Sequence, residues 1–395
     1  MLKNDKKDKI SIVTTNGILT IRRTILRPND ENSMAKLLEI EDVKCIAPMD
    51  VVLKIADLPF KATREMMCEV AFWGQNQSSY KAASSVIKKV YRVAMSSETV
   101  RAITDYVGRI VFEEDTKEAE DSYRNASTIY RSSVKDGVLY IQIDGAAVNT
   151  RTKNSEGSTW RENKLGVVFS SDNVIRGVNK KGKTESRILK KEYTSYIGSV
   201  QQFKKHLFAC AMRNGYGEYK ETVVLSDGAV WIKNMVDELF PDAIQVLDLF
   251  HLYENVYTYA KAIFGNDETK YKPWAESLVD MFKSGKMDDA IQMLKSFKDK
   301  KTPKGTVNLY HYVASNIDRI DYKEYAEKGY YVGSGAIESG NKVVLQKRMK
   351  LAGMRWDESS AQNLLSLRAK YESELWCHAV VDKLLKCDFE HLCIS

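Results

Sequence analysis

The chain has 395 residues, of which 44% are hydrophobic, 29% are charged and only 6 are proline. This length exceeds what one typical core supports, so we expect two or three domains, and the few prolines with many Lys/Glu-rich amphipathic stretches favour a largely helical protein. Apolar runs long enough to span a membrane are missing, and the start MLKNDKKDK lacks the apolar core of a signal peptide, so we expect a cytoplasmic protein.

The cysteines and the charges narrow the class further. The six cysteines form no Cys-x-x-Cys pair, which argues against a disulfide framework and against a thiolate zinc site. The net charge of +7 is mild, but the charges are unevenly distributed. Residues 113–121 hold six acids and one base, whereas residues 342–355 hold five bases and no acid. A basic segment of this kind is typical of a polyanion-binding protein.

The N-terminal region, residues 1–58, contains a predicted β-hairpin. Two β-rich runs over residues 10–26 flank Asn16-Gly17, which is a strong hairpin turn signal. Three helical patterns follow within the region 59–112, and they cover residues 61–73, 79–90 and 97–110.

Three short helices with a tight turn before the third predict a helix-turn-helix-like, DNA-binding region. Its third helix would present Arg101, Thr104 and Arg109 to a major groove. A plain three-helix bundle with a polar outer face is the alternative. The acidic, polar stretch that follows, residues 113–135, is predicted to be a linker.

The pattern changes to strands over residues 136–250. Five strand candidates cover residues 137–143, 164–171, 185–197, 222–226 and 243–247. One helical pattern precedes the fourth strand, and another precedes the fifth. This order predicts an α/β core with a mixed sheet. Beyond it, residues 250–328, 336–350 and 357–386 carry only helical patterns.

Two aspartates leave predicted strands in the same way. Asp144 and Asp227 each follow an apolar run and precede glycine. Ligands gather at the carboxyl ends of strands in open α/β sheets, and two carboxylates that converge there need a cation between them. Oxygen ligands of this kind suit Mg²⁺ or Mn²⁺. Each acid-Gly pair taken alone also fits an ordinary turn.

Glu338 is the candidate for a third metal ligand. It is the single acid in a predicted helix in which Lys342 lies four residues further on and could meet a phosphate. A helix-stabilising Glu–Lys pair, worth about 0.2–0.5 kcal/mol, is the alternative. That pair does not explain why the segment lacks every other acid.

Other chemistries find little support in the sequence. There are only five histidines, no G-x-S-x-G elbow and no G-x-x-x-x-G-K-[ST] loop. A glycosidase would also use two acids, but it has no use for a basic helix beside them. Metal-assisted phosphoryl chemistry on nucleic acid remains.

These residues resemble the catalytic triad of DDE transposases, and most closely bacterial insertion-sequence transposases of the IS-Lre type, related to the Mutator-like group. The stretches that carry the resemblance are YIQIDGAAVNTR, WRENKLGVVF, VVLSDGAVWI, DLFHLYENV and VGSGAIESGNKVVLQKRMKLAGMRW. They span roughly residues 136–370. The last of them is the most specific.

The resemblance implies a ribonuclease-H-like α/β core in two parts, residues 136–250 and 330–375, with an all-helical insertion at residues 251–329 and a C-terminal tail at residues 376–395. It also implies that Asp248 and His251 form an accessory pair that orients DNA or metal-bound water. A capped helix start with a partly buried histidine is the alternative reading of that pair.

The implied activity is cleavage and strand transfer of DNA. Asp144, Asp227 and Glu338 would hold two Mg²⁺ or Mn²⁺ ions about 3.5–4 Å apart. Backbone phosphates would be held by Lys342, Lys347, Arg348, Lys350 and Arg355, and Trp356 would either stack on a base or pack in the core.

The implied partners are double-stranded DNA, as element ends and target, and further copies of the chain in a homodimer or larger assembly. We expect no nucleotide cofactor. We expect the protein to be bacterial and to be associated with the nucleoid. A metal-dependent nuclease of the same fold and a non-catalytic repressor derived from a transposase are the alternatives.

Overall fold

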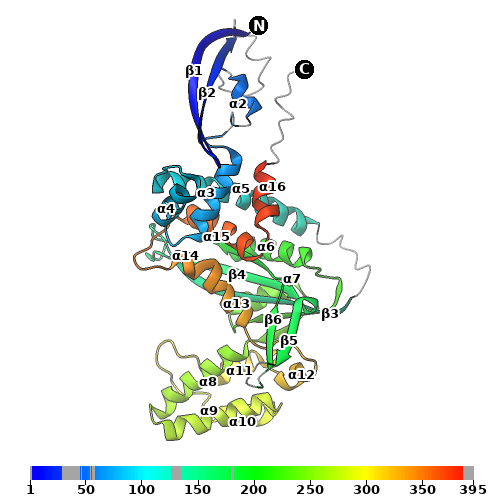
Figure 1. Ribbon diagram of the computed structural model, residues 1–395. Coiled ribbons are helices and arrows are strands. Elements are labelled where there is room, and N and C mark those ends of the chain that lie inside the picture. The colour runs from blue at the N-terminus through cyan, green and yellow to red at the C-terminus, as the bar shows by residue number, and fades with distance from the viewer. Residues whose placement is uncertain are drawn as a thin grey trace. The chain divides into compact units, whose positions relative to one another are not determined.

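We describe the protein from a computed structural model that places residues 2–28, 45, 47–53, 55, 58–125, 135–178, 182 and 184–385 (Figure 1). The chain divides into two compact units. One is made of residues 1–114 and 344–395, and the other of residues 115–343. None of the described helices is long and apolar enough to cross a membrane.

The first unit begins with a long two-stranded ribbon, β1 (Leu2–Thr14) and β2 (Gly17–Pro28). The strands are antiparallel and close at Thr14 opposite Gly17, where a φ of +112° requires glycine. The ribbon includes the hairpin expected over residues 10–26 and extends beyond it at both ends. One face of the ribbon packs Ile10 and Ile12 against Ile55, beside the short helix α2 (Pro48–Val52).

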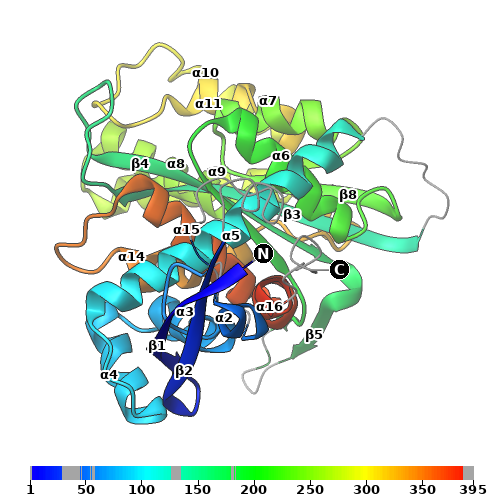
Figure 2. The ribbon, with the colours of Figure 1, turned by 90° about the horizontal axis from the view of Figure 1, so that it is seen from above.

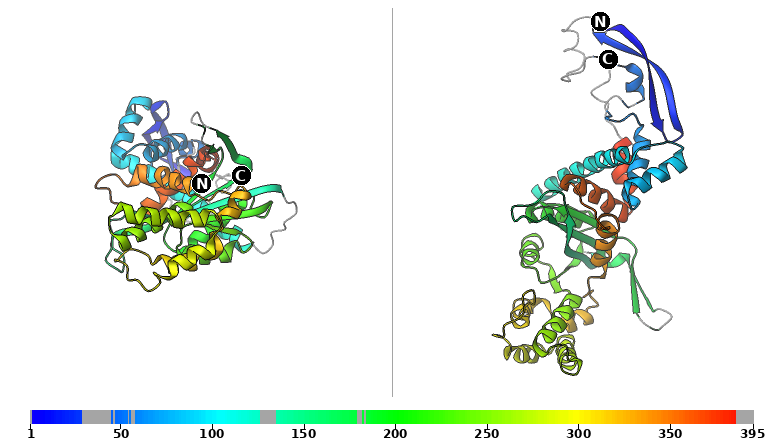
Figure 3. Two further views of the ribbon diagram at one scale, coloured as in Figure 1. Left: turned by 90° about the horizontal axis from the view of Figure 1, so that it is seen from below. Right: turned by 90° about the vertical axis from the view of Figure 1, so that its left-hand side faces the viewer.

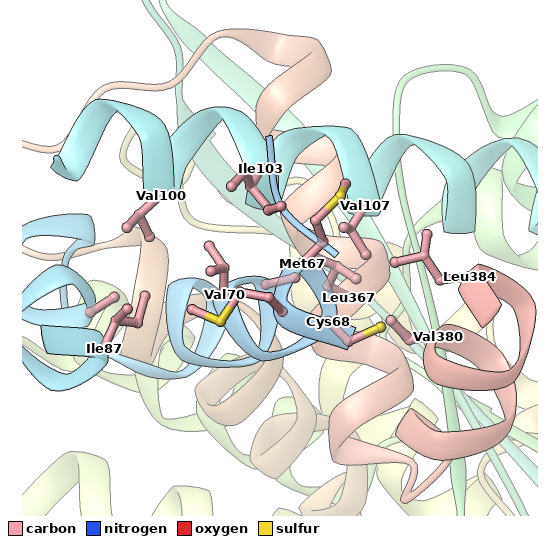
Figure 4. Close-up of a cluster of buried hydrophobic side chains, with 14 of the residues drawn as sticks. Met67, Cys68, Val70, Ile87, Val100, Ile103, Val107, Leu367, Val380 and Leu384 are labelled. Atoms are coloured by element: carbon pink, nitrogen blue, oxygen red, sulfur yellow. The ribbon is translucent and has the colours of Figure 1, made fainter. Parts of the chain in front are cut away.

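The helical part of the first unit is built from α3 (Arg64–Asn76), α4 (Tyr80–Tyr91) and α5 (Ser97–Arg124). Side chains of Thr63 and Ser79 accept hydrogen bonds from the first turns of α3 and α4, which satisfies amides that the helices leave unpaired. Their apolar faces meet in one buried cluster (Figure 4), which includes Met66, Met67, Val70, Ile87, Val100, Ile103 and Val107.

C-terminal segments complete this cluster. Leu367 comes from α15 (Glu358–Glu372), Val380 from a π-helix (Cys377–Val381) and Leu384 from α16 (Asp382–Leu385). The prediction of a tail over residues 376–395 is therefore wrong for residues 377–385, because their apolar side chains are buried in the core. Residues 386–395 lie outside the described part of the chain.

The acidic stretch 113–121 is helical, not a linker. It forms the second half of α5, because glutamate, lysine and alanine are good helix formers and two of its acids find cations nearby. Glu118 pairs with Arg213 at 2.7 Å, and Glu120 with Lys205 at 3.5 Å. Of the predicted linker 113–135, residues 126–134 lie outside the described residues.

The second unit is organised around a five-stranded mixed sheet. Its strands lie in the order β7 (Glu192–Ile197), β4 (Trp160–Ser170), β3 (Lys135–Asn149), β8 (Tyr219–Ser226) and β9 (Ile244–Leu247). β4 is antiparallel to both of its neighbours, whereas β3, β8 and β9 are parallel. This order is compatible with a ribonuclease-H-like α/β core.

The third predicted strand, residues 185–197, is two strands. β6 (Thr184–Ile188) pairs with β5 (Val174–Val178) in a separate ribbon that follows a short 3₁₀ turn (Ser171–Asn173). Only the second half of the stretch, β7, joins the main sheet. Leu189 and the polar residues Lys190 and Lys191 separate the two runs.

The two faces of the sheet are covered by different helices. Leu139, Ile141 and Ile143 of β3 point toward α6 (Val200–Arg213) and α7 (Val230–Leu239), which lie side by side along the sheet (Figure 2). Side chains alternate along a strand, so Gln142 and Asp144 belong to the opposite face. That face receives α13 (Gly335–Gly340).

Between β9 and α13 the chain forms helices only. These are α8 (Leu249–Phe264), α9 (Glu268–Lys283), α10 (Met287–Lys295), α11 (Leu309–Ala314), a 3₁₀ turn (Ile317–Arg319) and α12 (Tyr322–Glu327), and α8 to α11 are grouped together in every view (Figures 1 and 3). The segment returns to the sheet through Tyr322, whose hydroxyl donates to the carbonyl of Leu247 at 2.9 Å.

Helix α13 is fixed to the sheet by one buried glutamine. The Gln142 side chain donates to the carbonyl of Gly333 at 3.3 Å and accepts from the amide of Ile337 at 3.0 Å. After α13 the chain continues as a π-helix (Asn341–Gln346) and α14 (Lys347–Met349), where one continuous α-helix was expected over residues 336–350. Short π-helical stretches are frequent at functional sites.

Gly340 provides a test of this packing. A Cβ atom added at Gly340 would lie 2.5 Å from a ring carbon of buried Tyr193 and 3.1 Å from a methyl carbon of Leu165. We expect Gly340→Ala to lower the free energy of unfolding by about 1–3 kcal/mol through overpacking, measured by urea denaturation. Gly335→Ala is the matched control, because a Cβ atom there meets nothing within 4 Å. Equal stability of the two variants would contradict the close approach of α13.

Candidate active site

Asp144 and Asp227 are brought together by the register of the two central strands. Parallel pairing of β3 with β8 ends at Ile143 opposite Ser226, so the two aspartates are the next residues on adjacent strands. Neighbouring strands lie about 4.8 Å apart, and residues in register point to the same face. β3 does not end at Asp144, as the sequence suggested. It runs on to Asn149 along β4, with Asp144 opposite Leu165.

Both aspartates are half-buried and accept hydrogen bonds from the backbone. Asp144 accepts from the amide of Gly145 at 2.8 Å, and Asp227 accepts from the amide of Ala229 at 3.0 Å. Burial raises the pKa of Asp144, the bond from Gly145 opposes this, and the charge of Asp227 adds to the rise. The charges of the two carboxylates therefore repel each other.

Asn341, the residue that follows α13, contacts Asp144. Its side-chain NH₂ group donates to Asp144 at 2.5 Å. Asn341 is 5% exposed, and its own Oδ1 atom is buried without a hydrogen-bond partner in the described part of the chain. A buried acceptor of this kind is costly unless a ligand or ion meets it.

Asp248 and His251 form a second pair at the start of α8. Asp248 is 1% exposed and caps the helix, and it accepts from the amides of Phe250 at 3.1 Å and Ser334 at 3.2 Å. Its other oxygen meets Nδ1 of His251 at 2.5 Å. Burial alone would raise the pKa of Asp248, but the hydrogen bonds from His251 and Ser334 outweigh this effect and lower it.

Neighbouring carboxylates raise the pKa of His251. The hydrogen bond to Asp248 raises the pKa of His251 to about 9 against the effect of burial, and the charges of Asp227 and Asp144 raise it further. The His251 ring is thus bonded to the buried carboxylate of Asp248, and the charges of the two half-buried aspartates also favour its protonated form.

Glu338 does not contact the aspartates in this structure. It is exposed, and its carboxylate accepts from the Ser334 hydroxyl at 2.5 Å, one turn back along the chain. It is nevertheless tied to the site, because Asn341, three residues further on, is the group that reaches Asp144. The assignment of Glu338 as a metal ligand stays a prediction.

Two residues of the helical insertion contact the chain neighbours of Asp227, and the sequence patterns did not indicate them. Arg319 is 1% exposed and donates to the Ser226 hydroxyl at 2.7 Å. The Tyr312 ring lies against Gly228, where an added Cβ atom would come within 2.3 Å of it, and burial raises the pKa of Tyr312 to about 12. Neither residue stands in a recognisable motif, so only the tertiary structure reveals them.

The donor set fits a divalent metal in part. Two carboxylates and the unpartnered amide oxygen of Asn341 are hard oxygen donors, which suit Mg²⁺ or Mn²⁺. Among the described residues, no group of three or more His, Cys, Asp or Glu side chains has the spacing of a metal site. The aspartate pair therefore fits one side of such a site, and Glu338 does not complete it in this structure.

The predicted phosphate-binding residues separate into two groups. Lys342, Lys347, Lys350 and Arg355 are exposed. Arg348 is 2% exposed, and its assignment to DNA is wrong. Its guanidinium lies over the rings of Tyr80 and Trp356, 4.6 and 5.1 Å from their centroids, and donates to the carbonyl of Gly74 at 3.2 Å.

Trp356 packs in the core of the first unit and does not present a face for a base. It is 8% exposed, stacks on Arg348, and donates from its indole nitrogen to the carbonyl of Met349 at 3.2 Å. Of the two roles left open by the sequence, core packing is the one found.

Thr104 is likewise not available to a DNA groove. It is 1% exposed, and its hydroxyl donates to the carbonyl of Val100 at 2.7 Å. It fits against Gly74 of α3, where an added Cβ atom would come within 2.0 Å of the hydroxyl. Arg101 and Arg109 remain accessible at the surface, paired with Glu98 at 2.5 Å and Glu113 at 3.1 Å.

Comparison with known proteins adds little to this description. No protein-family model matches the chain, and no curated protein matches it. Among solved structures the chain is similar to the Drosophila P element transposase strand transfer complex, with 10% sequence identity and a TM-score of 0.36 over 88% of this chain and 99% of that chain. A match at this level shows neither a shared family nor a shared activity.

The Asp248–His251 pair generates a pH prediction. The pKa of His251 lies near its ordinary value of about 6.5 in the unfolded chain and at about 9 in the folded protein. Protonation of His251 therefore stabilises the fold fully below pH 6.5, and this contribution is lost as the pH rises to about 9. We expect the melting temperature, measured in EDTA, to fall over this range.

Two variants test the origin of that fall. His251→Gln should flatten it, because glutamine does not titrate, whereas His311→Gln, which removes an exposed histidine of α11, should leave it unchanged. A fall of the same size in the His251→Gln protein would show that another group is responsible.

Proposed function

We propose that this protein is a DNA transposase of the DDE type, which cuts the ends of a mobile element and joins the freed 3′-hydroxyls to target DNA. The observation that carries the proposal is the register of β3 and β8, which makes Asp144 and Asp227 neighbours where the parallel pairing ends. The Asn341 amide, from the segment that carries Glu338, lies against one of them. This arrangement suits metal-assisted phosphoryl transfer better than the other chemistries considered.

In this proposal Asp144 and Asp227 hold the metal ions, and Glu338 completes the ligand set when it exchanges its bond to Ser334 for the ions. Two bound Mg²⁺ or Mn²⁺ ions would supply charge stabilisation at the attacking and leaving oxygens. Asn341 holds Asp144 in place, and His251, oriented by Asp248, offsets the repulsion between the aspartates and the incoming phosphate.

The chemistry requires no nucleotide. In the first step water attacks a phosphodiester at the element end, one P–O bond forms, one breaks, and a 3′-hydroxyl leaves. In the second step that hydroxyl attacks a phosphodiester of the target and displaces another 3′-hydroxyl. One P–O bond is exchanged for another each time, so the reaction needs only DNA, water and the bound ions.

The exposed cations Lys342, Lys347, Lys350 and Arg355 are proposed to hold backbone phosphates, together with Arg101 and Arg109 on α5. Both ends of an element must be cut in coordination, which implies a homodimer or a larger assembly on DNA. Within DDE transposases we assign the chain to the bacterial insertion-sequence branch of the IS-Lre type, acting in the cytoplasm at the nucleoid, on the residue patterns described in the sequence analysis.

Replacement of the acids tests the proposed site. Asp144→Ala, Asp227→Ala and Glu338→Ala should each lower Mg²⁺-dependent cleavage by more than about 100-fold, the upper end of losses seen when groups that only support a metal ligand are removed. Affinity for duplex DNA should stay within a few-fold. Glu327→Ala, which removes an exposed acid of α12, is the control. Full cleavage by the Glu338→Ala protein would remove Glu338 from the triad.

The products decide between transposase and nuclease. Purified protein, Mg²⁺ and a plasmid with the sequences that flank its gene should give joined products, read by sequencing across the junctions. Nicks or breaks without joining would favour the nuclease, and binding without either would favour the repressor.

Asn341 offers a finer test of the geometry. Asn341→Ala removes the bond to Asp144, and loss of such a supporting group typically lowers activity about 10–100-fold. Gln346→Ala changes an exposed amide at the end of the same π-helix and should leave cleavage unchanged. Equal activity of both variants would show that Asn341 does not hold Asp144 during the reaction.

A further inference from the structure

The ribbon of β1 and β2 has two different faces. Directly opposite residues of an antiparallel pair share a face, and successive residues alternate between faces. Ile10, Ile12 and Ile25 are buried and define an inner face. Lys9 and its partner Arg22 therefore lie on the outer face of the ribbon.

This outer face carries three cations and no acid. It is formed by the pairs Lys7–Thr24, Lys9–Arg22, Ser11–Thr20 and Val13–Ile18. The side chains of Lys7, Lys9 and Arg22 are exposed, and within the described residues none of them makes an ion pair. They line a surface hollow together with Thr24 and parts of Asp8 and Arg23.

The acids of the hairpin are used elsewhere. Asp8 belongs to the inner face and pairs with Arg23 at 3.4 Å, and Arg23 also binds Asp50. Asp5 lies at a register shift between Asn4 and Lys6 and pairs with Arg27 at 3.0 Å. The acids of the ribbon thus pair with Arg23 and Arg27, and among the described residues Lys7, Lys9 and Arg22 of the outer face make no ion pair.

The repulsion between Lys9 and Arg22 destabilises the pairing of β1 with β2. Like charges directly opposite each other on adjacent strands destabilise a sheet, whereas most cross-strand pairs contribute about 0.2–1 kcal/mol of stability. An external anion would relieve this repulsion. Ser11 and Thr20, the next pair on the same face, bond to each other at 2.9 Å and add hydroxyl groups to the surface.

We propose that the outer face of the β1–β2 ribbon binds double-stranded DNA, with Lys7, Lys9 and Arg22 on backbone phosphates. A two-stranded ribbon fits the major groove of B-form DNA, and strands are known readers of that groove. The deep, narrow major groove of A-form RNA does not admit such an element. The choice of DNA among polyanions rests on the proposed function, whereas the uncompensated cations do not depend on it.

The test is the salt dependence of DNA binding by the full chain, measured by fluorescence anisotropy on a random-sequence duplex in EDTA, between about 50 and 200 mM salt. Each phosphate contact contributes about 0.9 to the slope of log K against log salt. The triple variant Lys7→Gln, Lys9→Gln, Arg22→Gln should therefore flatten the slope by about 2.7 and weaken binding.

A matched variant removes the same charge elsewhere. Lys286→Gln, Lys301→Gln, Lys304→Gln changes three exposed lysines of the helical insertion and lowers the net charge from +7 to +4, as the hairpin variant does, because three positive charges are lost in each. It should keep the wild-type slope. Equal slopes for both triple variants would overturn the proposal, and so would an equal loss of affinity for an RNA duplex.

Two further measurements separate this proposal from others. The melting temperature of the single variant Arg22→Gln should be unchanged or higher, because the repulsion with Lys9 is removed, and a lower value would assign the cations a structural role. The swap Lys9→Arg, Arg22→Lys should keep the wild-type slope. Binding is measured without metal, so the result does not depend on cleavage. A flatter slope for the hairpin variant supports the DNA-binding surface even if the protein never cuts DNA. An unchanged slope overturns it even if the protein does cut DNA.

Discussion

The buried side chain of Gln142 holds the candidate site together. It lies in the middle of the central strand, 1% exposed, and both ends of its amide are bonded to the segment that begins α13, at Gly333 and Ile337. A buried amide group left without a partner costs about 1–3 kcal/mol, so the start of α13 is confined to one position on the sheet. Gly340 then permits contact with the sheet at the far end of the same helix. With both ends fixed, the next residue, Asn341, reaches the carboxylate of Asp144.

The electrostatics of the site follow from this placement. Asp144 and Asp227 are set side by side by strand pairing, and neither contacts a lysine or arginine among the described ion pairs. The nearby positive charge comes from His251, whose pKa of about 9 depends on a carboxylate, Asp248, that is itself buried and fully bonded. The imidazolium therefore moderates the repulsion of the aspartates without neutralising them. The proposed metal binding requires this remaining negative charge, and it also requires the exposed Glu338 side chain to leave its bond to Ser334.

The sequence predicted those features that depend on local pattern. The Asn16-Gly17 turn, the alternation in the central strands and the acid-Gly dipeptides after apolar runs led to the hairpin, to most of the sheet, and to Asp144 and Asp227. Features that depend on distant contacts were not predictable. The helical pattern placed Thr104 on the groove-facing side, whereas the structure packs it against Gly74. The acidic stretch 113–121 likewise gave no indication that its acids pair with Lys205 and Arg213 of α6. Arg319 and Tyr312 lie within the helical insertion, far from Asp227 along the chain, so no spacing rule could have found them.

The basic segments of the chain show why charge counting alone misassigns function. Arg348 belongs to the most basic stretch of the sequence, yet its guanidinium contacts two aromatic rings and a backbone carbonyl inside the protein. A planar, weakly hydrated guanidinium can be buried by stacking on aromatic rings. The hairpin is less conspicuous in the sequence, since Asp5 and Asp8 are interspersed with its lysines. Strand register separates these charges: the acids pair with Arg23 and Arg27, and Lys7, Lys9 and Arg22 remain on one exposed face. The hairpin differs from a scatter of exposed lysines because strand register places Lys9 directly opposite Arg22, with Lys7 on the same face, and this clustering depends on the register and not on the density of bases along the chain.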